Sequence, residues 1–490
     1  MSASPASPLI DPQVFHHKVY TTAGWVATAA TLDVVDKASG QTLCTVGQAS
    51  ADEVAQAARD AAAAQAAWAA RPPRERADIL RAAGDALKAE FDAISVHIAR
   101  ETGGIMPKAQ LEVNEAATLC YLASGQVLES AGVILPSTPG RMNLARRVPM
   151  GVVGVISPFN FPLILSMRSV APALAVGNAV VLKPDPQTPI TGGLLIARAF
   201  EKAGLPKGLL HVLPGGPEAG QALVNAPEVR MVQFTGSTAV GRLIGEACGR
   251  LLKKVSLELG GKSPLIVLDD ADPDLAASNI AFGAWLHQGQ ICMASGRILL
   301  HEKIAPAVIE RLVAKATHLP VGDPTGQVAI GPMINARQVA RAQAIVDDSV
   351  RAGAKLEAGG THDGLFFKPT VLSGVKPGMR AFEEEVFGPV ANITTFSTDD
   401  EAVALANQTE YGLSSAVISP DMGRAMAIGD RIKAGMLHIN DQTVADECIN
   451  PFGGTGCSGN GSRIGGPANL EDFTQWQWVT IKARAPQYPF

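Results

Sequence analysis

The chain has 490 residues, of which 47% are hydrophobic and 18% charged, and its formal net charge at pH 7 is −5. This composition is ordinary for a folded α/β enzyme and excludes a disordered chain. No long run of Lys or Arg offers a docking face for nucleic acid or an anionic membrane, and at about 150 residues per domain the length predicts two or three lobes.

The first residues and the cysteines indicate a cytoplasmic protein. Residues 1–8 have neither the basic start nor the apolar run of a secretory signal. The longest apolar stretches, such as residues 171–182, are too short or too interrupted by Pro and Gly to span a bilayer. The six cysteines have no CxxC spacing, which argues against a disulfide framework and a zinc site. We therefore expect reduced thiols and no metal.

The first third of the chain predicts a helical layer. Ser50 and Glu53 have the spacing of a capping box, and the Ala-rich run that follows, as far as Trp68, is expected to be a helix. Apolar residues at helical spacing predict two further helical stretches, residues 74–101 and 108–128.

From residue 151 onward, β-rich runs alternate with helical ones, which is typical of parallel, doubly wound sheets. The expected strands of a first series are residues 152–156, 179–182, 209–213, 231–234 and 256–259, with helices at 191–203, 219–226 and 239–252 between them. A second series begins with strand 265–268 and continues with a helix from Pro273, strand 297–301 and helix 305–318. The predicted fold class is therefore α/β, with two doubly wound parallel-sheet lobes.

The C-terminal segment adds one more expected strand. Residues 475–481 read Gln-Trp-Gln-Trp-Val-Thr-Ile and alternate as strands do. An exposed edge strand of this kind needs a partner, which we expect another chain to supply.

Two patterns that look like nucleotide-binding motifs carry little weight. Residues 454–459 fit GxGxxG, but no strand precedes them and no clear helix opens within them. Gly261-Lys262-Ser263 has the end of a P-loop, yet Ser256 occupies the place of the required first glycine. Neither pattern predicts a phosphate site.

Six other motifs are more informative, and three of them close strands of the predicted sheet, where such folds hold ligands. They are Ser-Pro-Phe-Asn-Phe-Pro at 157–162, Phe-Thr-Gly-Ser-Thr-Ala-Val-Gly at 234–241, Glu-Leu-Gly-Gly-Lys at 258–262, Gly-Gln-Ile-Cys at 289–292, Glu-Val-Phe-Gly-Pro-Val at 385–390, and Pro-Phe-Gly-Gly at 451–454 with Ser458-Gly459. Together and in this order they resemble the aldehyde dehydrogenase superfamily from Val34 to Ile481. Residues 183–188 and 210–216 resemble bacterial benzaldehyde dehydrogenases in particular.

The resemblance implies a division of the chain into domains. Residues 1–130 and 146–257 would form the dinucleotide-binding domain, and residues 258–437 the catalytic cysteine domain. Residues 131–145 and 471–490 would form a small β arm for oligomerisation, which implies a homodimer or homotetramer. Residues 438–470 would return to the cofactor domain and supply an active-site loop.

Three residues are assigned to catalysis by the same resemblance. Cys292 is the nucleophile, because a thiolate adds readily to a carbonyl and later leaves from a thioester. Glu258 would activate the water that hydrolyses the thioester. It would be the only general base, since the family's second candidate acid aligns with Gly466. Asn160 would form an oxyanion hole with the Cys292 amide. Taken singly, a buried thiol, a surface carboxylate and a turn asparagine would be the commoner interpretations.

The resemblance also implies a nicotinamide cofactor. It assigns Lys183 to the adenosine ribose, Gly236 and Ser237 to a pyrophosphate loop at a helix N-terminus, Glu385 to the nicotinamide ribose, and Phe387 to the side of the ring. The other cofactor residues it implies are Ile156, Ser157, Gly216, Gly220, Phe234, Thr235, Val240, Leu259 and Gly260.

One position in this region departs from the family pattern. Pro186 stands where many NAD-specific relatives carry a glutamate that binds the ribose hydroxyls. Proline has no charge to repel a 2′-phosphate, so we expect NADP to be used as well as NAD. The alternative is that Asp185 supplies the missing carboxylate.

Seven residues fall where the family lines its aldehyde tunnel: Phe161, Leu165, Arg168, Ile291, Met293, Asp446 and Phe452. Arg168 replaces an aromatic residue of many relatives. Its guanidinium could bond a substituent on a substrate ring or pair with Asp446 or Glu447, and the sequence leaves both open.

The expected activity is NAD(P)-dependent oxidation of an aldehyde, preferably an aromatic one such as benzaldehyde, to the carboxylic acid through a thiohemiacetal and a thioester on Cys292. One alternative is a CoA-acylating dehydrogenase, against which Glu258 argues, since a thiol acceptor needs no hydrolytic base. Another is a catalytically silent binding or structural protein on the same fold. The joint presence of Cys292, Glu258 and Asn160 argues against it.

Overall fold

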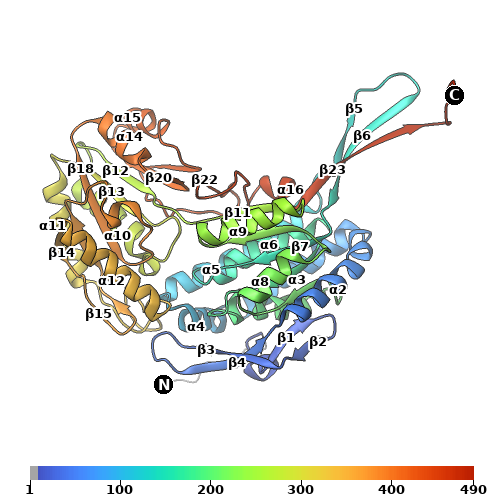
Figure 1. Cartoon of the computed structure of the whole chain (residues 1–490), viewed down its shortest axis with the longest axis horizontal. Coiled ribbons are helices and arrows are strands. Elements are labelled where there is room, and N and C mark those ends of the chain that lie inside the picture. Colours follow the sequence, from blue (N-terminus) through green and yellow to red (C-terminus); the bar gives the residue numbers. More distant parts are fainter. Residues whose placement is uncertain (1–8) are drawn as a thin grey trace.

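A computed structural model describes residues 9–490, so the expectation for residues 1–8 lies outside the described residues. Two α/β lobes lie side by side, and a β arm projects from one of them (Figure 1). Each lobe is built on a seven-stranded, mostly parallel sheet. The predicted fold class is therefore confirmed.

The sheet of the first lobe has the strand order β11-β10-β7-β8-β9-β1-β2. Its five parallel strands are the predicted ones: β7 (Val152–Ile156), β8 (Ala179–Lys183), β9 (Leu210–Val212), β10 (Val229–Thr235) and β11 (Lys254–Glu258). The sequence did not indicate the other two, β1 (Lys18–Thr21) and β2 (Gly24–Ala27), which form an antiparallel hairpin beyond β9. A second unpredicted hairpin, β3 (Ala30–Val35) with β4 (Thr42–Gln48), contacts β1.

Helices cover both faces of this sheet. Strands β7, β8 and β9 follow one another toward one edge of the sheet. The chain then crosses back, and β10 and β11 are added on the other side of β7. Right-handed crossovers therefore place α6 (Pro162–Ala175) and α7 (Leu195–Lys202) on one face, and α8 (Pro217–Asn225) and α9 (Thr238–Arg250) on the other. The helix α2 (Ala51–Ala69) packs beside α8. It begins with the predicted capping box, in which the Ser50 hydroxyl accepts from the Glu53 amide at 3.3 Å.

Two helical predictions need correction. The stretch 74–101 is two helices, α3 (Pro73–Ala89) and α4 (Phe91–Thr102), because Glu90 between them leaves the helical conformation (φ −114°, ψ 22°). The helix expected at 191–203 begins with a π-helical turn, Ile190–Leu194, before α7. A Cβ at Gly193 in this turn would lie 2.6 Å from the Val212 side chain, so a regular side chain does not fit there. The stretch 108–128 is one helix, α5 (Met106–Gln126).

The sheet of the second lobe has the strand order β14-β17-β18-β13-β12-β20-β21. Its strands are β12 (Pro264–Val267), β13 (Arg297–His301), β17 (Thr370–Ser373), β18 (Val390–Phe396), β20 (Ser414–Ile418) and β21 (Met436–Ile439), all parallel, with β14 (Lys355–Ala358) antiparallel at one edge. Leu265 and Val267 pack into one hydrophobic cluster and Ile266 into another, as expected for a strand buried on both faces. The helices are α10 (Pro273–Trp285), α11 (Ala305–His318), α12 (Ala336–Arg351), α13 (Arg380–Glu383), α14 (Asp399–Asn407) and α15 (Met422–Gly429).

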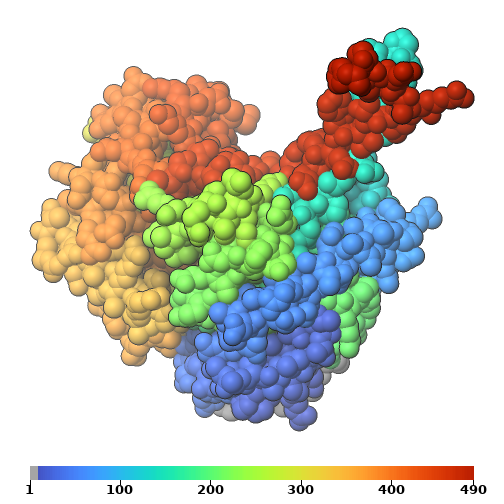
Figure 2. Space-filling view, turned by 45° about the vertical axis from the view of Figure 1, so that its right-hand side comes forward, coloured from blue at the N-terminus to red at the C-terminus, as the bar shows by residue number. Residues whose placement is uncertain are grey.

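The projecting arm is a three-stranded sheet, β23-β6-β5, drawn at the upper right of Figures 1 and 2. Its strands are β5 (Gly132–Leu135), β6 (Arg141–Pro149) and β23 (Thr474–Lys482). The predicted strand at 475–481 therefore exists, and one of its edges pairs with β6 of the same chain. Large apolar side chains stay exposed on the arm, among them Ile134 (77%) and Trp478 (69%).

The chain returns from the second lobe to the first before it enters the arm. Gly459 forms a bridge with Glu258 at the end of β11, and α16 (Ala468–Phe473) precedes β23. Short elements complete the description: α1 (Pro12–Phe15), β15 (His362–Asp363), β16 (Phe366–Phe367), β19 (Tyr411–Gly412) and β22 (Thr455–Gly456). Among residues 9–490, no helix combines the length and the apolar character that crossing a bilayer requires.

Candidate active site

The carboxyl ends of adjacent parallel strands bring the predicted residues together. Asn160 follows β7, Lys183 ends β8, Thr235 ends β10 and Glu258 ends β11, and these strands share one sheet. Cys292 comes from the second lobe and lines one cavity with Asn160. The candidate site therefore lies between the lobes, beyond the strand ends where α/β folds hold ligands.

The loop that carries Cys292 has an unusual backbone. His287 (φ 47°) and Gln288 (φ 56°) are non-glycine residues in the left-handed region, which costs about 1–3 kcal/mol each. The Gln288 side chain donates to the Gly103 carbonyl at 2.9 Å and holds the loop from one side. On the other side, a Cβ at Gly261 would overlap the Cys292 carbonyl oxygen. Only glycine at position 261 lets the loop lie where it does.

The Cys292 thiol is not activated by its surroundings in the free protein. Burial raises its pKa, and the negative charges of Glu385, Glu258 and Asp446 raise it further. The thiol is therefore protonated at neutral pH, and nucleophilic attack requires that its proton be removed. All six cysteines are free thiols.

Asn160 is buried beside this loop. Its side-chain amide donates to the Gln290 carbonyl oxygen at 2.9 Å, which fixes the orientation of the amide. A side-chain amide has two N–H donors, so the second remains for a ligand in the cavity.

Glu258 is almost completely buried (2% exposed). Neither carboxyl oxygen has a hydrogen-bond partner in the part of the chain that the structure describes, and a Cβ at Gly453 would lie 2.8 Å from Oε1. Burial raises the pKa of Glu258 well above its usual value, while Arg463 and Arg168 act in the opposite direction. A buried carboxyl group without a partner and with high proton affinity is suited to proton transfer.

Gly466 lies where the sequence placed the family's second candidate acid. Its backbone is left-handed (φ 50°), and a Cβ there would overlap the carbonyl oxygen of Ile449. The position therefore admits no side chain in this fold.

The cofactor candidates of the first lobe lie at or near the ends of its parallel strands. Ile156 and Ser157 end β7, Lys183 ends β8, and Gly216 caps α8. A Cβ at Gly220 would lie 3.6 Å from Lys183 Cδ and 3.9 Å from Ile156 Cδ1, so these three residues are neighbours although they are distant in sequence.

The N-terminus of α9 follows the end of β10. Ser237 caps the helix by accepting from the Val240 amide at 3.4 Å, and Ser237 and Val240 are exposed. A Cβ at Gly236 would lie 2.5 Å from the Phe234 ring, so the turn before the helix needs glycine. The N–H groups at a helix N-terminus are suited to phosphate.

Asp185 is engaged in a turn. Its Oδ1 accepts from the Gln187 amide at 2.9 Å, and Gln187 Nε2 donates to the same oxygen at 3.3 Å. The turn therefore holds the carboxylate through Oδ1. Lys183 Nζ donates to the Pro184 carbonyl at 3.2 Å, and burial lowers the pKa of this lysine.

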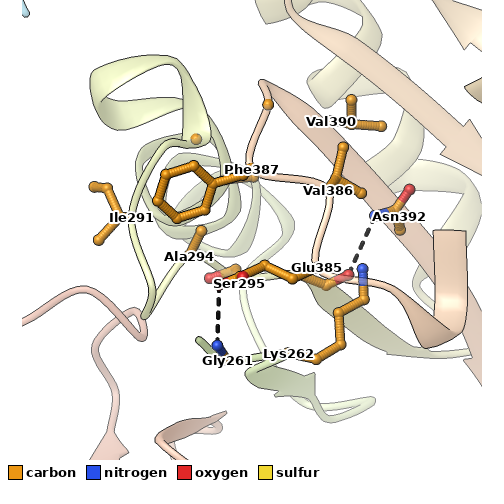
Figure 3. Close-up of a pocket in the computed structure, with 14 residues that line it drawn as sticks. Gly261, Lys262, Ile291, Ala294, Ser295, Glu385, Val386, Phe387, Val390 and Asn392 are labelled. Carbon is orange, nitrogen blue, oxygen red and sulfur yellow. Dashed lines mark hydrogen bonds between the residues drawn. The ribbon is translucent and has the colours of Figure 1, made fainter. Parts of the chain in front are cut away.

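On the second-lobe side, Glu385 and Phe387 line a pocket of about 300 Å³ together with Ile291 and Ala294, which are close to Cys292 in sequence (Figure 3). Glu385 Oε1 accepts from the Gly261 amide at 3.0 Å, and a Cβ at Gly260 would lie 2.6 Å from Oε2. Phe387 has a left-handed backbone (φ 53°), and its ring lies beside Ile291 in Figure 3.

The same pocket contains a residue that the sequence did not single out. Lys262 is 1% exposed, and its Nζ has no hydrogen-bond partner among residues 9–490. Burial lowers its pKa to about 7, with Arg297 adding to the effect. Its place in the Glu-Leu-Gly-Gly-Lys motif was the only available signal.

All seven predicted tunnel residues line one cavity of about 670 Å³, together with Asn160 and Cys292. The sequence missed six further wall residues: Leu111, Glu115, Ile164, Leu286, Val444 and Cys448. Leu111 and Glu115 are four residues apart on α5, a helix that carries none of the recognised motifs.

The structure shows one of the two contacts left open for Arg168. Its Nη2 donates to Asp446 Oδ2 at 2.6 Å, so the guanidinium pairs with this carboxylate. The guanidinium also lies over the Phe452 ring, 5.0 Å from its centroid.

Comparison with known proteins gives one family throughout. Residues 25–479 match the family described as the aldehyde dehydrogenase family. A vanillin dehydrogenase from Amycolatopsis sp. is 51% identical over 98% of this chain and 99% of its own. A protein named benzaldehyde dehydrogenase [NAD(+)] from Pseudomonas putida is 49% identical over 97% and 98%. The crystal structure of a salicylaldehyde dehydrogenase from Pseudomonas putida G7, complexed with salicylaldehyde, is similar with a TM-score of 0.93, 35% identity, and coverage of 96% and 99%.

Proposed function

The chain belongs to the aldehyde dehydrogenase family, and from this premise we propose that it oxidises aromatic aldehydes to carboxylic acids with a nicotinamide cofactor. The observation that carries the proposal is the cavity that Cys292 and Asn160 line together with the aromatic side chains of Phe161 and Phe452. The names of the relatives, which act on vanillin, benzaldehyde and salicylaldehyde, favour aromatic substrates.

Cys292 begins the proposed reaction. Its thiol gives its proton to a water molecule, the sulfur forms a bond to the aldehyde carbon, and the carbonyl π electrons move to oxygen to give the thiohemiacetal oxyanion. The free N–H of Asn160 and the Cys292 amide donate to this oxygen. Each such donor typically contributes about 3 kcal/mol to transition-state stabilisation.

The bound cofactor supplies the acceptor for the hydride that leaves the thiohemiacetal carbon. At this stage the chain's own residues position the nicotinamide end of the cofactor. The strained backbone at Phe387 and the bond from the Gly261 amide to Glu385 fix two candidate contacts for the nicotinamide end.

Glu258 completes the cycle. In its ionised form it accepts a proton from water, whose oxygen attacks the thioester carbon; the C–S bond breaks, and the thiolate regains its proton. The raised pKa of Glu258 makes it a stronger base than an exposed carboxylate. Since Gly466 admits no acid, Glu258 performs this step alone.

The cofactor is proposed to be NAD or NADP. Lys183 would hold the adenosine ribose, the turn at Gly236 and Ser237 the pyrophosphate, and Glu385 the nicotinamide ribose. Pro186 places no negative charge against a 2′-phosphate, and Asp185 is engaged in its turn. One relative carries NAD in its name, so NADP use is the part of this proposal that most needs a measurement.

The parts of the chain would divide the work. Residues 1–130 and 146–257 bind the cofactor, residues 258–437 supply the cysteine, and residues 438–470 return to complete the active site. Residues 131–145 and 471–490 form an arm for pairing with a second copy, which the exposed Ile134 and Trp478 support. The mass of the protein in solution checks this part.

The test of the proposed function is an assay of cofactor reduction with benzaldehyde, vanillin and acetaldehyde, each with NAD and NADP. We expect the highest kcat/KM with an aromatic aldehyde, because the ring fills the cavity that Phe161 and Phe452 line. A higher kcat/KM for acetaldehyde than for benzaldehyde would refute the aromatic preference. Absence of reduction with all three aldehydes would refute the dehydrogenase activity.

A further inference from the structure

The wall of the cavity beside Cys292 combines two kinds of side chain. Phe161, Ile291 and Phe452 are apolar. Arg168, Asp446, Glu115 and Cys448 add polar groups to the same wall, and we call these four residues the polar end. Charged groups that face a substrate are costly to desolvate unless the substrate bonds to them, and an unsubstituted aromatic ring cannot do so.

Arg168 does not offer its guanidinium to a ligand. It is 2% exposed, its Nη2 is bonded to Asp446, and the group lies over the Phe452 ring. Its Nε and Nη1 are buried without a hydrogen-bond partner among residues 9–490, so no substrate oxygen reaches them in this arrangement. Arg168 is therefore an anchor for the Asp446 carboxylate.

Asp446, in contrast to Arg168, offers an atom to a ligand. Its side chain is 24% exposed. Arg168 occupies Oδ2, while Oδ1 has no donor in the part of the chain that the structure describes. The anchored carboxylate thus presents one free acceptor at the cavity wall.

Asp446 and Cys292 line the same cavity, so a ring whose aldehyde carbon bonds to Cys292 lies in the space that Asp446 also lines. The charge of Asp446 also raises the pKa of the Cys292 thiol and of the Glu258 carboxyl. Glu115, the other carboxylate of the polar end, is also bonded through one oxygen, because its Oε2 accepts from the Cys448 thiol at 2.8 Å. The two carboxylates differ in their anchors, since Asp446 is held by a guanidinium and Glu115 by a neutral thiol.

We propose that Asp446, anchored by Arg168, binds a hydroxyl group on the aromatic ring, so that the preferred substrates are hydroxylated aromatic aldehydes. This inference rests on the proposed function and assigns its substrate class. A carboxylate accepts a hydrogen bond and cannot donate one, so it recognises a ring hydroxyl but not the methyl ether of that hydroxyl. Hydrogen bonds to charged groups are among the stronger ones in proteins.

The test compares kcat/KM for 3-hydroxybenzaldehyde and 4-hydroxybenzaldehyde with the values for the matching methoxybenzaldehydes, with benzaldehyde as the reference. We expect the wild-type enzyme to favour the hydroxyl compound over its ether by about 10- to 100-fold at one ring position at least. This comparison needs no variant and does not depend on how a substitution affects folding.

Variants then assign the preference to a residue. Asp446→Asn should reduce the hydroxyl-to-ether ratio to a few-fold, because the acceptor loses its charge. Glu115→Gln tests the other carboxylate of the wall and should keep the ratio. Glu447→Gln, an exposed neighbouring carboxylate that does not line the cavity, is the matched control and should also keep it. Arg168→Met should lower the ratio as Asp446→Asn does, since the carboxylate loses its anchor, and Arg168→Lys should restore part of it.

The outcomes separate this inference from the proposed function. Oxidation of benzaldehyde together with equal rates for hydroxyl and ether compounds would overturn the inference and leave the proposed function in place. An equal or greater preference for the ethers would instead mean that Arg168 acts as a donor to the substituent, which also overturns it. Loss of the preference in Glu115→Gln but not in Asp446→Asn would do the same. Failure to oxidise any aldehyde of the set would overturn both proposals.

Discussion

The side-chain amide of Asn160 donates a hydrogen bond of 2.9 Å to the backbone carbonyl of Gln290, two residues before Cys292. This bond connects the loop after β7 in the first lobe with the cysteine loop of the second. The candidate oxyanion donor and the candidate nucleophile are therefore positioned by each other rather than by either lobe alone.

Asn160→Ala should lower kcat by about 10²–10³-fold, because one donor to the oxyanion is lost in the transition state. The KM for the aldehyde should change much less. Steady-state kinetics with benzaldehyde measure both constants. A large rise in KM with kcat unchanged would place Asn160 in substrate binding rather than in transition-state stabilisation.

Cys292→Ala should abolish aldehyde oxidation and leave cofactor binding intact, since the thiol forms the covalent intermediate. Cofactor reduction and the fluorescence change on cofactor binding measure the two properties. Cys44→Ala, which removes another buried thiol, is the matched control and should stay active. Turnover near the wild-type rate in Cys292→Ala would contradict the covalent mechanism.

Glu258→Gln should give one burst of reduced cofactor and then stall, because hydride transfer precedes the step that needs the base. Quenched-flow traces with benzaldehyde measure the burst. Glu302→Gln, an exposed glutamate of the second lobe, should turn over normally. Slow steady formation of product without a burst would place Glu258 before hydride transfer instead.

The raised pKa of Cys292 predicts slow alkylation of the free protein at neutral pH. Only the thiolate reacts with iodoacetamide, so below this pKa the rate at Cys292 should rise about tenfold per pH unit. Mass spectrometry of the Cys292 peptide between pH 6 and about 9 measures this dependence. A plateau below neutral pH would show that the thiol is already ionised.

NADP should support oxidation alongside NAD, because Pro186 presents no charge against the 2′-phosphate. Pro186→Glu should weaken NADP use much more than NAD use. The two values of kcat/KM in the wild type and the variant decide the matter. A wild-type preference for NAD beyond about a thousandfold, roughly 4 kcal/mol, would mean that a repelling charge persists.

The parallel strands were predictable because each is a short apolar run followed by a helical period, and local sequence carries that pattern. The first hairpin was not, since β1 and β2 have four residues each and are only partly buried. The break between α3 and α4 at Glu90 could not be predicted, because no glycine or proline lies next to it in the sequence. In each case the contacts that decide the structure come from distant parts of the chain.

In the candidate site, too, some residues could be predicted from the sequence and others depend on contacts between distant parts of the chain. Asn160, Glu258 and Cys292 stood out because their motifs resemble those of a known family. Glu115 and Cys448 did not, since they approach each other only when α5 packs beside the loop that returns from the second lobe. The pairing of Arg168 with Asp446 likewise joins residues far apart in sequence, and the sequence could only leave it open.

The left-handed backbone at Gly466 limits how this enzyme can evolve. Any side chain at that position would collide with the carbonyl oxygen of Ile449, so a single codon change cannot restore a second acid. The segments on both sides of the collision would have to be rebuilt together. Under the proposed mechanism, position 466 therefore cannot supply a second base, and an acid introduced there would not rescue a variant that lacks the Glu258 carboxylate.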